Sequence, residues 1–275
     1  MNLSMKTVEH GKGILVGIAL LLTLLFCVAC GESDPAKESY KEAVKLYKAG
    51  NYYDAANLFD SIDYKDSQEK ADECYFLVQK DGLQHLSAGD IVKFGYYEQD
   101  NNEENGKEEI EWIVVEADDS KASMISKYSL DYQKYNSFFG EITWGECSLR
   151  TWLNDSFYND AFGAIHQKMI EEAMVIDDET DNITYDRVFL PSLQEAEYIF
   201  GPRQDSEIRG AACYPTNYAA SKGAGDYDGW WTRTSGYYPE YATFLDSYGI
   251  ILGSKVNDFQ YVRPAIVINT SIDLP

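Results

Sequence analysis

Gly229-Trp230-Trp231-Thr232-Arg233-Thr234 and Tyr261-Val262-Arg263-Pro264-Ala265-Ile266-Val267-Ile268 are the two stretches that decide how this chain folds. Each is an apolar, strand-like run that carries one arginine, and an always-charged guanidinium is costly to bury without a partner. We therefore expect carboxylates or main-chain oxygens to hold Arg233 and Arg263 inside one sheet of the main domain. The loops beside these runs are then its ligand-facing surface.

The two adjacent tryptophans define the faces of the first run. Side chains of neighbouring strand residues point to opposite faces, so one ring should lie in the core. The other lies on the surface, or else the long preceding loop covers both. A surface tryptophan with tyrosines nearby is typical of carbohydrate and peptide sites. The predicted ligand-binding residues are Trp230, Trp231, Arg233, Tyr237 and Tyr241.

Three further residues are predicted to be structural. Arg150 and Arg263 are expected to fix loops through forked hydrogen bonds to carboxylates or carbonyls, and Trp152 lies on the apolar face of a short helix with Arg150. Asp228 is a candidate ion partner for Arg233 in the same hairpin.

Composition limits the class of partner. The chain has 275 residues, 45% of them hydrophobic and 14% aromatic, with 22 tyrosines, which supports a real core. Its formal net charge of -23 repels nucleic-acid phosphates and anionic lipids. No nucleic-acid partner is expected, whereas a neutral, cationic or calcium-bridged ligand is compatible with this charge. Solubility alone also explains such a charge.

The amino terminus has the features of an export signal. Lys6 and Lys12 precede the apolar run Gly13–Ala29, and Cys30 follows it. This pattern resembles a bacterial lipoprotein signal over residues 1–30, which implies lipidation at Cys30. An uncleaved transmembrane helix is the alternative, since the run is near the minimum spanning length. Either anchor places the rest of the chain on the extracytoplasmic face of the cell membrane.

Three cysteines remain after the signal, and an odd number in an exported protein cannot be fully paired. A disulfide between Cys147 and Cys213 and three free thiols, Cys74 included, are both compatible with the sequence.

Residues 31–80 predict a small α-helical hairpin module. Apolar residues recur at helical spacing from Tyr40, from Tyr52 and from Ala71, and Gly50 separates the first two stripes. The stretch 46–59 resembles a tetratricopeptide repeat. Its matching residues are Gly50, Tyr52, Ala55 and Phe59. The tryptophan of that family's first helix is absent. One repeat is fewer than a solenoid needs for stability, so the module is either a protein-interaction element or a spacer.

Residues 81–275 predict an α+β domain. Three successive short strands suggest an antiparallel meander, and Ser192 with Glu195 forms a capping box that starts a helix at Leu193. The polar, glycine-rich segment Gly201–Gly229 is long enough to be functional or disordered. The strands are expected at 91–97, 110–116, 122–126, 230–234, 242–245 and 261–268.

Short motifs in this domain carry a family resemblance. They are Phe94-Gly95, Ile110-Glu111-Trp112, Cys147 to Asn154, Trp231-Thr232-Arg233 and Val262-Arg263-Pro264-Ala265. Together they resemble an uncharacterised bacterial domain family of exported or membrane-tethered proteins. More distantly, the domain is similar to formylglycine-generating-enzyme-like domains, which have a variant of the C-type lectin fold. That resemblance implies a mixed, mainly antiparallel sheet with short helices. The enzymes of that group use a cysteine pair near the carboxyl end, and here no cysteine follows Cys213.

The sequence offers little for catalysis. After the signal only His85 and His166 remain, and no zinc, nucleophile-elbow or phosphate-loop motif occurs. Carboxylate-pair hydrolysis stays open because acids are abundant. Two acidic clusters could bind calcium, Asp177–Asn182 and Asp226–Gly229, with Asp226 and Asp228 as candidate ligands. Solvated acidic loops are the alternative explanation for both clusters.

The sequence thus favours a surface-anchored lipoprotein binding module that recognises a glycan, a wall component or a protein, and catalysis is not expected. The ligand is expected at loops within 201–229 and 237–258. An extracellular carboxylate-dependent hydrolase and a scaffold that binds proteins through its helical module are the competing hypotheses. A carboxylate pair in one cleft would favour the hydrolase, an exposed aromatic patch the binding module, and an exposed apolar groove on the helices the scaffold.

Overall fold

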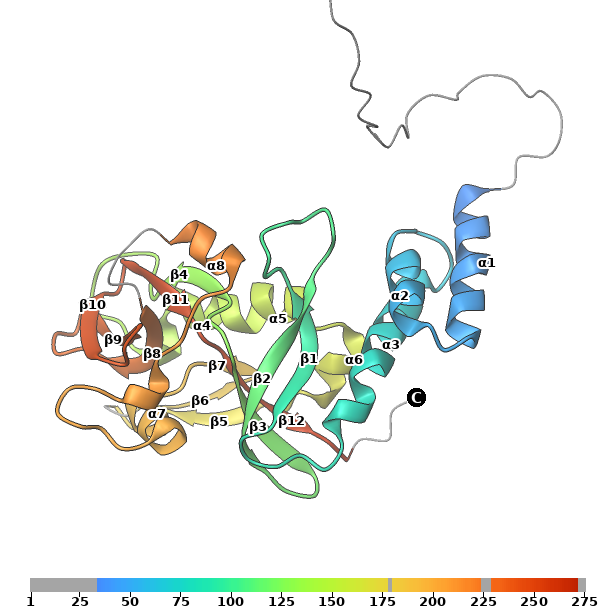
Figure 1. The fold of residues 1–275 in the computed structure, drawn as a ribbon. Helices are drawn as coiled ribbons and strands as arrows, with labels where there is room; N and C mark the ends of the chain where they lie inside the picture. The colour runs from blue at the N-terminus through green and yellow to red at the C-terminus, as the bar shows by residue number, and fades with distance from the viewer. Residues whose placement is uncertain (1–33, 178–179, 224–228, 272–275) are drawn as a thin grey trace, which may run out of the picture. The chain divides into compact units, whose positions relative to one another are not determined.

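The computed structural model describes residues 34–177, 180–223 and 229–271 (Figure 1). Residues 35–275 form one compact unit. Its architecture is mixed α+β, with mainly antiparallel sheets and short helices. No helix within the described residues is long and apolar enough to cross a membrane. The predicted export signal with Cys30 lies outside the described residues, as does the transmembrane alternative over the same segment.

The predicted helical module is present. Its helices are α1 (Pro35–Lys48), α2 (Tyr52–Asp60) and α3 (Ser67–Gln79), and a 3₁₀ turn, η1 (Lys80–Leu83), follows. A small separate core of alanines around Phe59 and Cys74 holds the three helices together. Short side chains on both helices let α1 and α2 approach closely, as the repeat-like pattern predicts.

Helix α3 also belongs to the main domain. Its Phe76 is buried in the main core rather than in the small one. At its end, Gln79 accepts a hydrogen bond from the Gly95 main-chain nitrogen at 3.0 Å, and its Oε1 lies 2.9 Å from His166 Nε2. One helix therefore takes part in two hydrophobic clusters, and the helical module is fixed to the domain that follows.

The first sheet has the order β1-β2-β3-β12-β7, and Figure 1 shows its first three strands between the helical module and the second sheet. The strands are β1 (Ile91–Tyr97), β2 (Glu108–Ala117), β3 (Lys121–Ser126), β7 (Val188–Phe189) and β12 (Ala265–Asn269). The first three form the predicted antiparallel meander. The sequence locates them well because each alternates buried and solvent-facing residues over most of its length.

The second sheet has the order β10-β9-β8-β11-β4. Its strands are β4 (Asp131–Lys134), β8 (Gly229–Ser235), β9 (Tyr241–Asp246), β10 (Ile251–Lys255) and β11 (Phe259–Val262). A separate hairpin joins β5 (Ala173–Ile176) and β6 (Ile183–Asp186).

The expectation of a single strand over 261–268 is wrong. Tyr261 pairs in parallel with Trp230 in the second sheet, whereas Ala265 pairs with Ile125 in the first. The break falls at Pro264, which has no main-chain N–H to donate to a ladder. The two arginine-bearing runs thus share the second sheet only through β8 and β11, and β12 lies between β3 and β7 in the first.

Short helices cover the sheets. They are α4 (Ser148–Trp152), a π-helical turn (Leu153–Phe157), α5 (Tyr158–Ala161), α6 (Ala164–Met169), α7 (Leu193–Phe200) and α8 (Asn217–Lys222), with 3₁₀ turns at Trp144–Glu146 and Arg209–Ala211. The predicted capping box is present at the start of α7, where Ser192 and Glu195 bond reciprocally. Residues 201–223, expected as a long loop, contain α8 and pack Ile208 and Ala211 over the second sheet.

Cys74, Cys147 and Cys213 are buried free thiols. This excludes the disulfide between Cys147 and Cys213 and supports the alternative. Burial raises the pKa of the Cys147 thiol to about 12 and that of Cys74 to about 11, so both stay protonated near neutral pH. They act as small apolar side chains rather than as nucleophiles.

Candidate functional site

Arg233 and Arg263, the arginines of the two apolar runs, donate hydrogen bonds to oxygens of the protein itself. Arg233 in β8 forms a two-pronged ion pair with Glu195, at 2.5 and 2.6 Å, and also donates to the main-chain oxygens of Leu190 and Ile176. Its partner is thus the N3 glutamate of the α7 capping box. Asp228, the partner considered from the sequence, lies outside the described residues. The guanidinium is buried against the protein and does not face a ligand surface.

Arg263 lies between the two sheets. Its guanidinium donates to the main-chain oxygens of Ser126 and Ala211 and stacks over the rings of Phe200 and Trp230, at 4.5 and 5.2 Å from the ring centroids. Burial lowers its pKa. Carbonyl dipoles and aromatic faces thus surround this charge, and within the described residues no carboxylate pairs with it.

Arg150 and Trp152 lie on α4, beside the β5–β6 hairpin. Arg150 pairs with the buried carboxylate of Asp186 at 2.6 Å and donates to the Gly145 oxygen. Trp152 is partly buried and packs its ring 5.5 Å from that of Phe157. The ion pair with Asp186 ties the helix to the hairpin.

Both tryptophans of the first run are fully buried, although they face opposite sides of β8. Trp231 enters the main core and donates from Nε1 to the Gln133 oxygen. Trp230 lies under residues 201–213 and donates to the Ala211 oxygen. Because the sheet is covered on both faces, this burial removes Trp230, Trp231 and Arg233 from the ligand-facing surface that the sequence predicted.

Tyrosines of the next turn are exposed instead. Tyr237 is 92% exposed and Tyr238 54%, with their rings 4.9 Å apart, while Tyr241 is half-buried beside Tyr238. The loop with Phe138, 80% exposed, and Phe139 lies next to this turn, because the Ile142 nitrogen donates to the Pro239 oxygen. We call the four exposed rings, Phe138, Phe139, Tyr237 and Tyr238, the aromatic surface.

A polar groove adjoins the aromatic surface at Phe138. It encloses about 420 Å³ and also contains Trp152. The other lining residues carry hydroxyls, amides and carboxylates, and they are Asn136, Ser137, Glu146, Ser148, Thr151, Asp155 and Ser156. An aromatic ring with hydroxyl and amide groups around it fits a ligand that is both apolar and rich in hydrogen-bonding groups.

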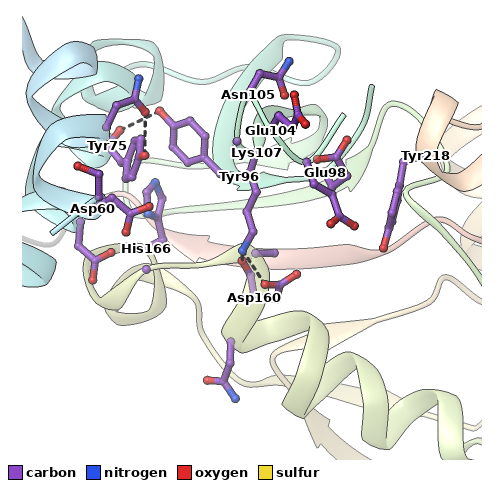
Figure 2. A pocket seen from close by; sticks show the side chains of 18 residues that line it. Asp60, Tyr75, Tyr96, Glu98, Glu104, Asn105, Lys107, Asp160, His166 and Tyr218 are labelled. Atoms are coloured by element: carbon purple, nitrogen blue, oxygen red, sulfur yellow. Dashed lines mark hydrogen bonds and ion pairs between the residues drawn. The ribbon is translucent and has the colours of Figure 1, made fainter. Parts of the chain in front are cut away.

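A larger groove, about 760 Å³, lies where the helical module meets the β1–β2 connection and α5–α6 (Figure 2). Its carboxylates are Asp60, Asp72, Glu98, Glu103, Glu104 and Asp160. Lys107 is the one cation among its described lining residues, and it reaches Asp160 Oδ1 at 2.5 Å. We call this the acidic groove. His166 lies at its inner wall, and burial lowers the pKa of this imidazole to about 4.

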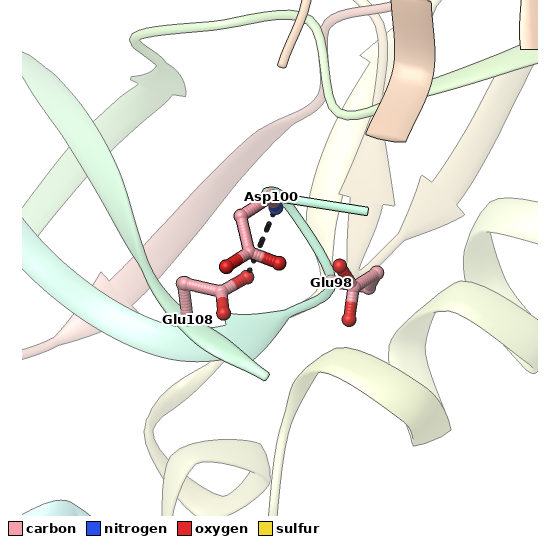
Figure 3. Close-up of side chains that lie close together, drawn as sticks. All are labelled: Glu98, Asp100 and Glu108. Atoms are coloured by element: carbon pink, nitrogen blue, oxygen red, sulfur yellow. Dashed lines mark hydrogen bonds between the residues drawn. The ribbon is translucent and has the colours of Figure 1, made fainter. Parts of the chain in front are cut away.

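Three carboxylates gather at the β1–β2 connection, with ligating oxygens within 4.8 Å of one another: Glu98, Asp100 and Glu108 (Figure 3). Loop nitrogens already bond to all three, and Glu98 accepts from the Asn102 main-chain nitrogen. Glu108 accepts from the main chain at Gln99 and Asp100, while Asp100 accepts from Asn102. These bonds close the turn, so the cluster has a structural explanation without an ion.

The predicted calcium ligands, Asp226 and Asp228, lie outside the described residues, as does part of the Asp177–Asn182 cluster. Neither groove is predicted from the sequence. The adjacent rings of Phe138 and Phe139 before Gly140 were a usable signal, because apolar residues in a turn have no strand or helix to bury them. The acidic groove had no local signal, since distant segments assemble it.

Residues 119–270 match the model of a family described as a domain of unknown function, DUF6273. The match starts just before β3, so it leaves out β1, β2 and the helical module. No curated protein and no solved structure matches the chain. The family model covers more than half of the sequence, and the chain therefore belongs to the DUF6273 family.

Proposed function

We propose that this protein is a membrane-tethered, extracytoplasmic binding protein that recognises a neutral glycan or wall strand through the aromatic surface and its polar groove. One observation carries the proposal: four large rings are exposed on two loops that are distant in sequence and joined by the hydrogen bond from the Ile142 nitrogen to the Pro239 oxygen. A soluble protein rarely leaves such rings together unless they contact a partner.

The chemistry of the polar groove supports a sugar. Pyranose rings present apolar C–H faces that pack on aromatic rings, and their hydroxyls need donors and acceptors around the rim. Phe138 and Trp152 supply the rings, while Ser148 and Thr151 are among the hydroxyls that supply the rim. The net charge of -23 disfavours anionic polymers and leaves neutral strands acceptable.

The location follows from the amino terminus, which resembles a lipoprotein signal with Cys30 as the lipidated residue. Two acyl chains on Cys30 would give stable anchoring, whereas one would not. The finer fold assignment, a C-type-lectin-like or formylglycine-enzyme-like domain, belongs to the same proposal. It would place loop-borne ligand contacts at one end of the sheets.

The two competing functions have weaker support. The carboxylate-dependent hydrolase has one observation in its favour, because six carboxylates line the acidic groove. Two of them are already engaged, since Asp160 pairs with Lys107 and Asp72 accepts a hydrogen bond from the Ala164 main-chain nitrogen. A scaffold would need an apolar groove on the helices. Among the described residues of α1–α3, Tyr53 and Val78 are the large apolar side chains that are exposed.

The test measures binding of the full chain in detergent to purified wall sacculi and to neutral oligosaccharides, with and without calcium. Phe138→Ala combined with Tyr237→Ala should weaken binding about tenfold or more, since aromatic anchors contribute above about 1 kcal/mol each. Tyr53→Ala combined with Tyr214→Ala removes two exposed rings elsewhere and should leave it unchanged. Equal binding by both double variants, or no binding by the unaltered chain, would remove the proposal.

A further inference from the structure

The acidic groove is separate from the aromatic surface, and its walls come from both parts of the molecule. Helices α2 and α3 contribute Asp60, Asp72 and Tyr75, while the β1–β2 connection and α5 contribute the other four acids. A cleft of about 760 Å³ is within the range that holds a small ligand or a few side chains of a peptide. Its surplus of carboxylates selects for positive charge.

Glu98 differs from the other acids of this groove because it is buried. Its side chain lines the groove but is only 8% exposed. One oxygen accepts from the Asn102 main-chain nitrogen at 2.9 Å, and no lysine or arginine of the described residues pairs with this carboxylate. Burial raises its pKa. This carboxylate is thus held by the main chain with no cation beside it, and a positively charged ligand would supply one.

A lysine of the protein itself, Lys222, binds beside the groove through a tyrosine ring and a carboxylate. Lys222 lies 3.9 Å from the centroid of the Tyr218 ring, which also lines the groove, and bonds both oxygens of Asp131 at 3.0 Å. In Figure 2, Glu98 lies between Lys107 and Tyr218. Tyr75 and Tyr96 add two more rings to the same lining. Carboxylates beside tyrosine rings suit an ammonium or guanidinium group.

We propose that the acidic groove binds a lysine- or arginine-rich peptide segment of an extracytoplasmic partner, with Glu98 as its innermost anchor. Charge complementarity identifies the occupant. The groove offers six carboxylates against Lys107, which Asp160 already neutralises. These acids extend from α2 to the β1–β2 connection and α5, a spread that suits several basic side chains along one backbone better than a single ion. The site is distinct from the proposed glycan surface.

The experiment titrates the full chain in detergent with a fluorescein-labelled peptide of alternating glycine and arginine, using a glycine–glutamate peptide as the reference. Binding should be specific to the arginine peptide and should weaken as sodium chloride rises, because salt screens the exposed acids. Glu98→Gln keeps the shape and removes the charge, so Kd should rise about tenfold or more, since bonds to charged groups contribute about 1.5–3 kcal/mol. Asp205→Asn removes an exposed charge outside the groove and should leave Kd unchanged.

A second variant keeps the proposal open to refutation even if Glu98→Gln does not fold. Lys107→Ala removes the competing ammonium from a partly exposed position and frees Asp160, so peptide affinity should rise several-fold. Equal affinity in Glu98→Gln and Asp205→Asn, or weaker binding by Lys107→Ala, would overturn the proposal. Binding of spermine or calcium without binding of the peptide would also overturn it. Phe138→Ala combined with Tyr237→Ala should leave peptide binding unchanged, which keeps this test independent of the glycan test.

Discussion

The guanidinium of Arg233 donates hydrogen bonds from all three of its nitrogens. Glu195 takes two of its N–H groups, and the main-chain oxygens of Leu190 and Ile176 take others. Arg233→Met should destabilise the fold by about 2–4 kcal/mol, because buried carbonyls lose their donors while the apolar stem is kept. Urea unfolding measures the loss. Arg209→Met breaks the exposed pair with Glu207 and should cost at most about 0.5 kcal/mol, so similar losses would contradict this description of Arg233.

His166 should make stability depend on pH. Burial lowers its pKa from 6.5 to about 4, so between these values the unfolded chain binds a proton that the folded chain does not. Its contribution is therefore fully kept above pH 6.5 and is lost as pH falls toward 4, by up to about 3 kcal/mol. His166→Gln does not titrate and should lose less stability over this interval. Asp72, whose pKa burial raises, titrates in both chains and cancels in the comparison.

A matching pH dependence in the two chains would mean that His166 is protonated inside the folded protein. Chemical unfolding at pH 7, 5.5 and 4.5 distinguishes the two cases, because only the difference between the chains is attributed to this residue.

Within β1, Gly95 allows the strand to pack closely against the helices. Its φ is +75°, and a Cβ there would lie 2.6 Å from Phe162 Cδ1 and 2.7 Å from the Ala161 oxygen. Gly95→Ala should cost about 3–4 kcal/mol, from backbone strain plus overpacking. Gly106 has a similar φ of +88° but open space around it, so Gly106→Ala should cost about 1–2 kcal/mol. Thermal melting of the two variants checks the order, and equal losses would exclude a packing role for Gly95.

Elements with a complete local signal could be predicted, whereas those set by distant pairing could not. Helix α7 carries its own capping box, and β1 to β3 carry their own alternation. Strands β4 and β10 are short and partly polar, and only their neighbours in the sheet select them. The apolar pattern of residues 261–268 continues across Pro264 and therefore predicts one strand. The change of sheet at Pro264 depends on long-range contacts, which the pattern does not contain.

The features of the candidate sites also fall into those that the local sequence predicts and those that only the fold reveals. The sequence predicts Tyr237 at the ligand-facing surface from its place near two tryptophans, and it is exposed. The apolar run around Arg233 predicts that this arginine needs a partner. The identity of that partner, Glu195, required the fold, because the residue also caps a helix. Two tryptophans on opposite faces are both covered only because residues 201–213 return over the sheet.

At the scale of the whole molecule, α3 joins the two hydrophobic clusters. Ala71 and Cys74 pack with the helical module, whereas Phe76 packs with the main domain. The module and the domain are therefore expected to unfold in a linked order rather than as one unit. The small cluster, built mostly of alanines, buries little area and should open first.

Two phenylalanine substitutions test that order. Phe59→Ala removes the one large side chain among the buried residues of the small cluster and should produce an early transition while the main one stays in place. Phe76→Ala acts in the main core and should lower the main transition by about 3–5 kcal/mol. Far-ultraviolet circular dichroism follows the helices. Tryptophan fluorescence reports the main domain, because the five tryptophans of the chain all lie there.

Coincident melting by both probes in Phe59→Ala would show that the two clusters unfold together. In that case the acidic groove between them would persist until the whole chain unfolds. Separate melting would instead mean that the groove is lost first, and that the proposed basic peptide, by binding both walls, should raise the early transition and leave the main one unchanged.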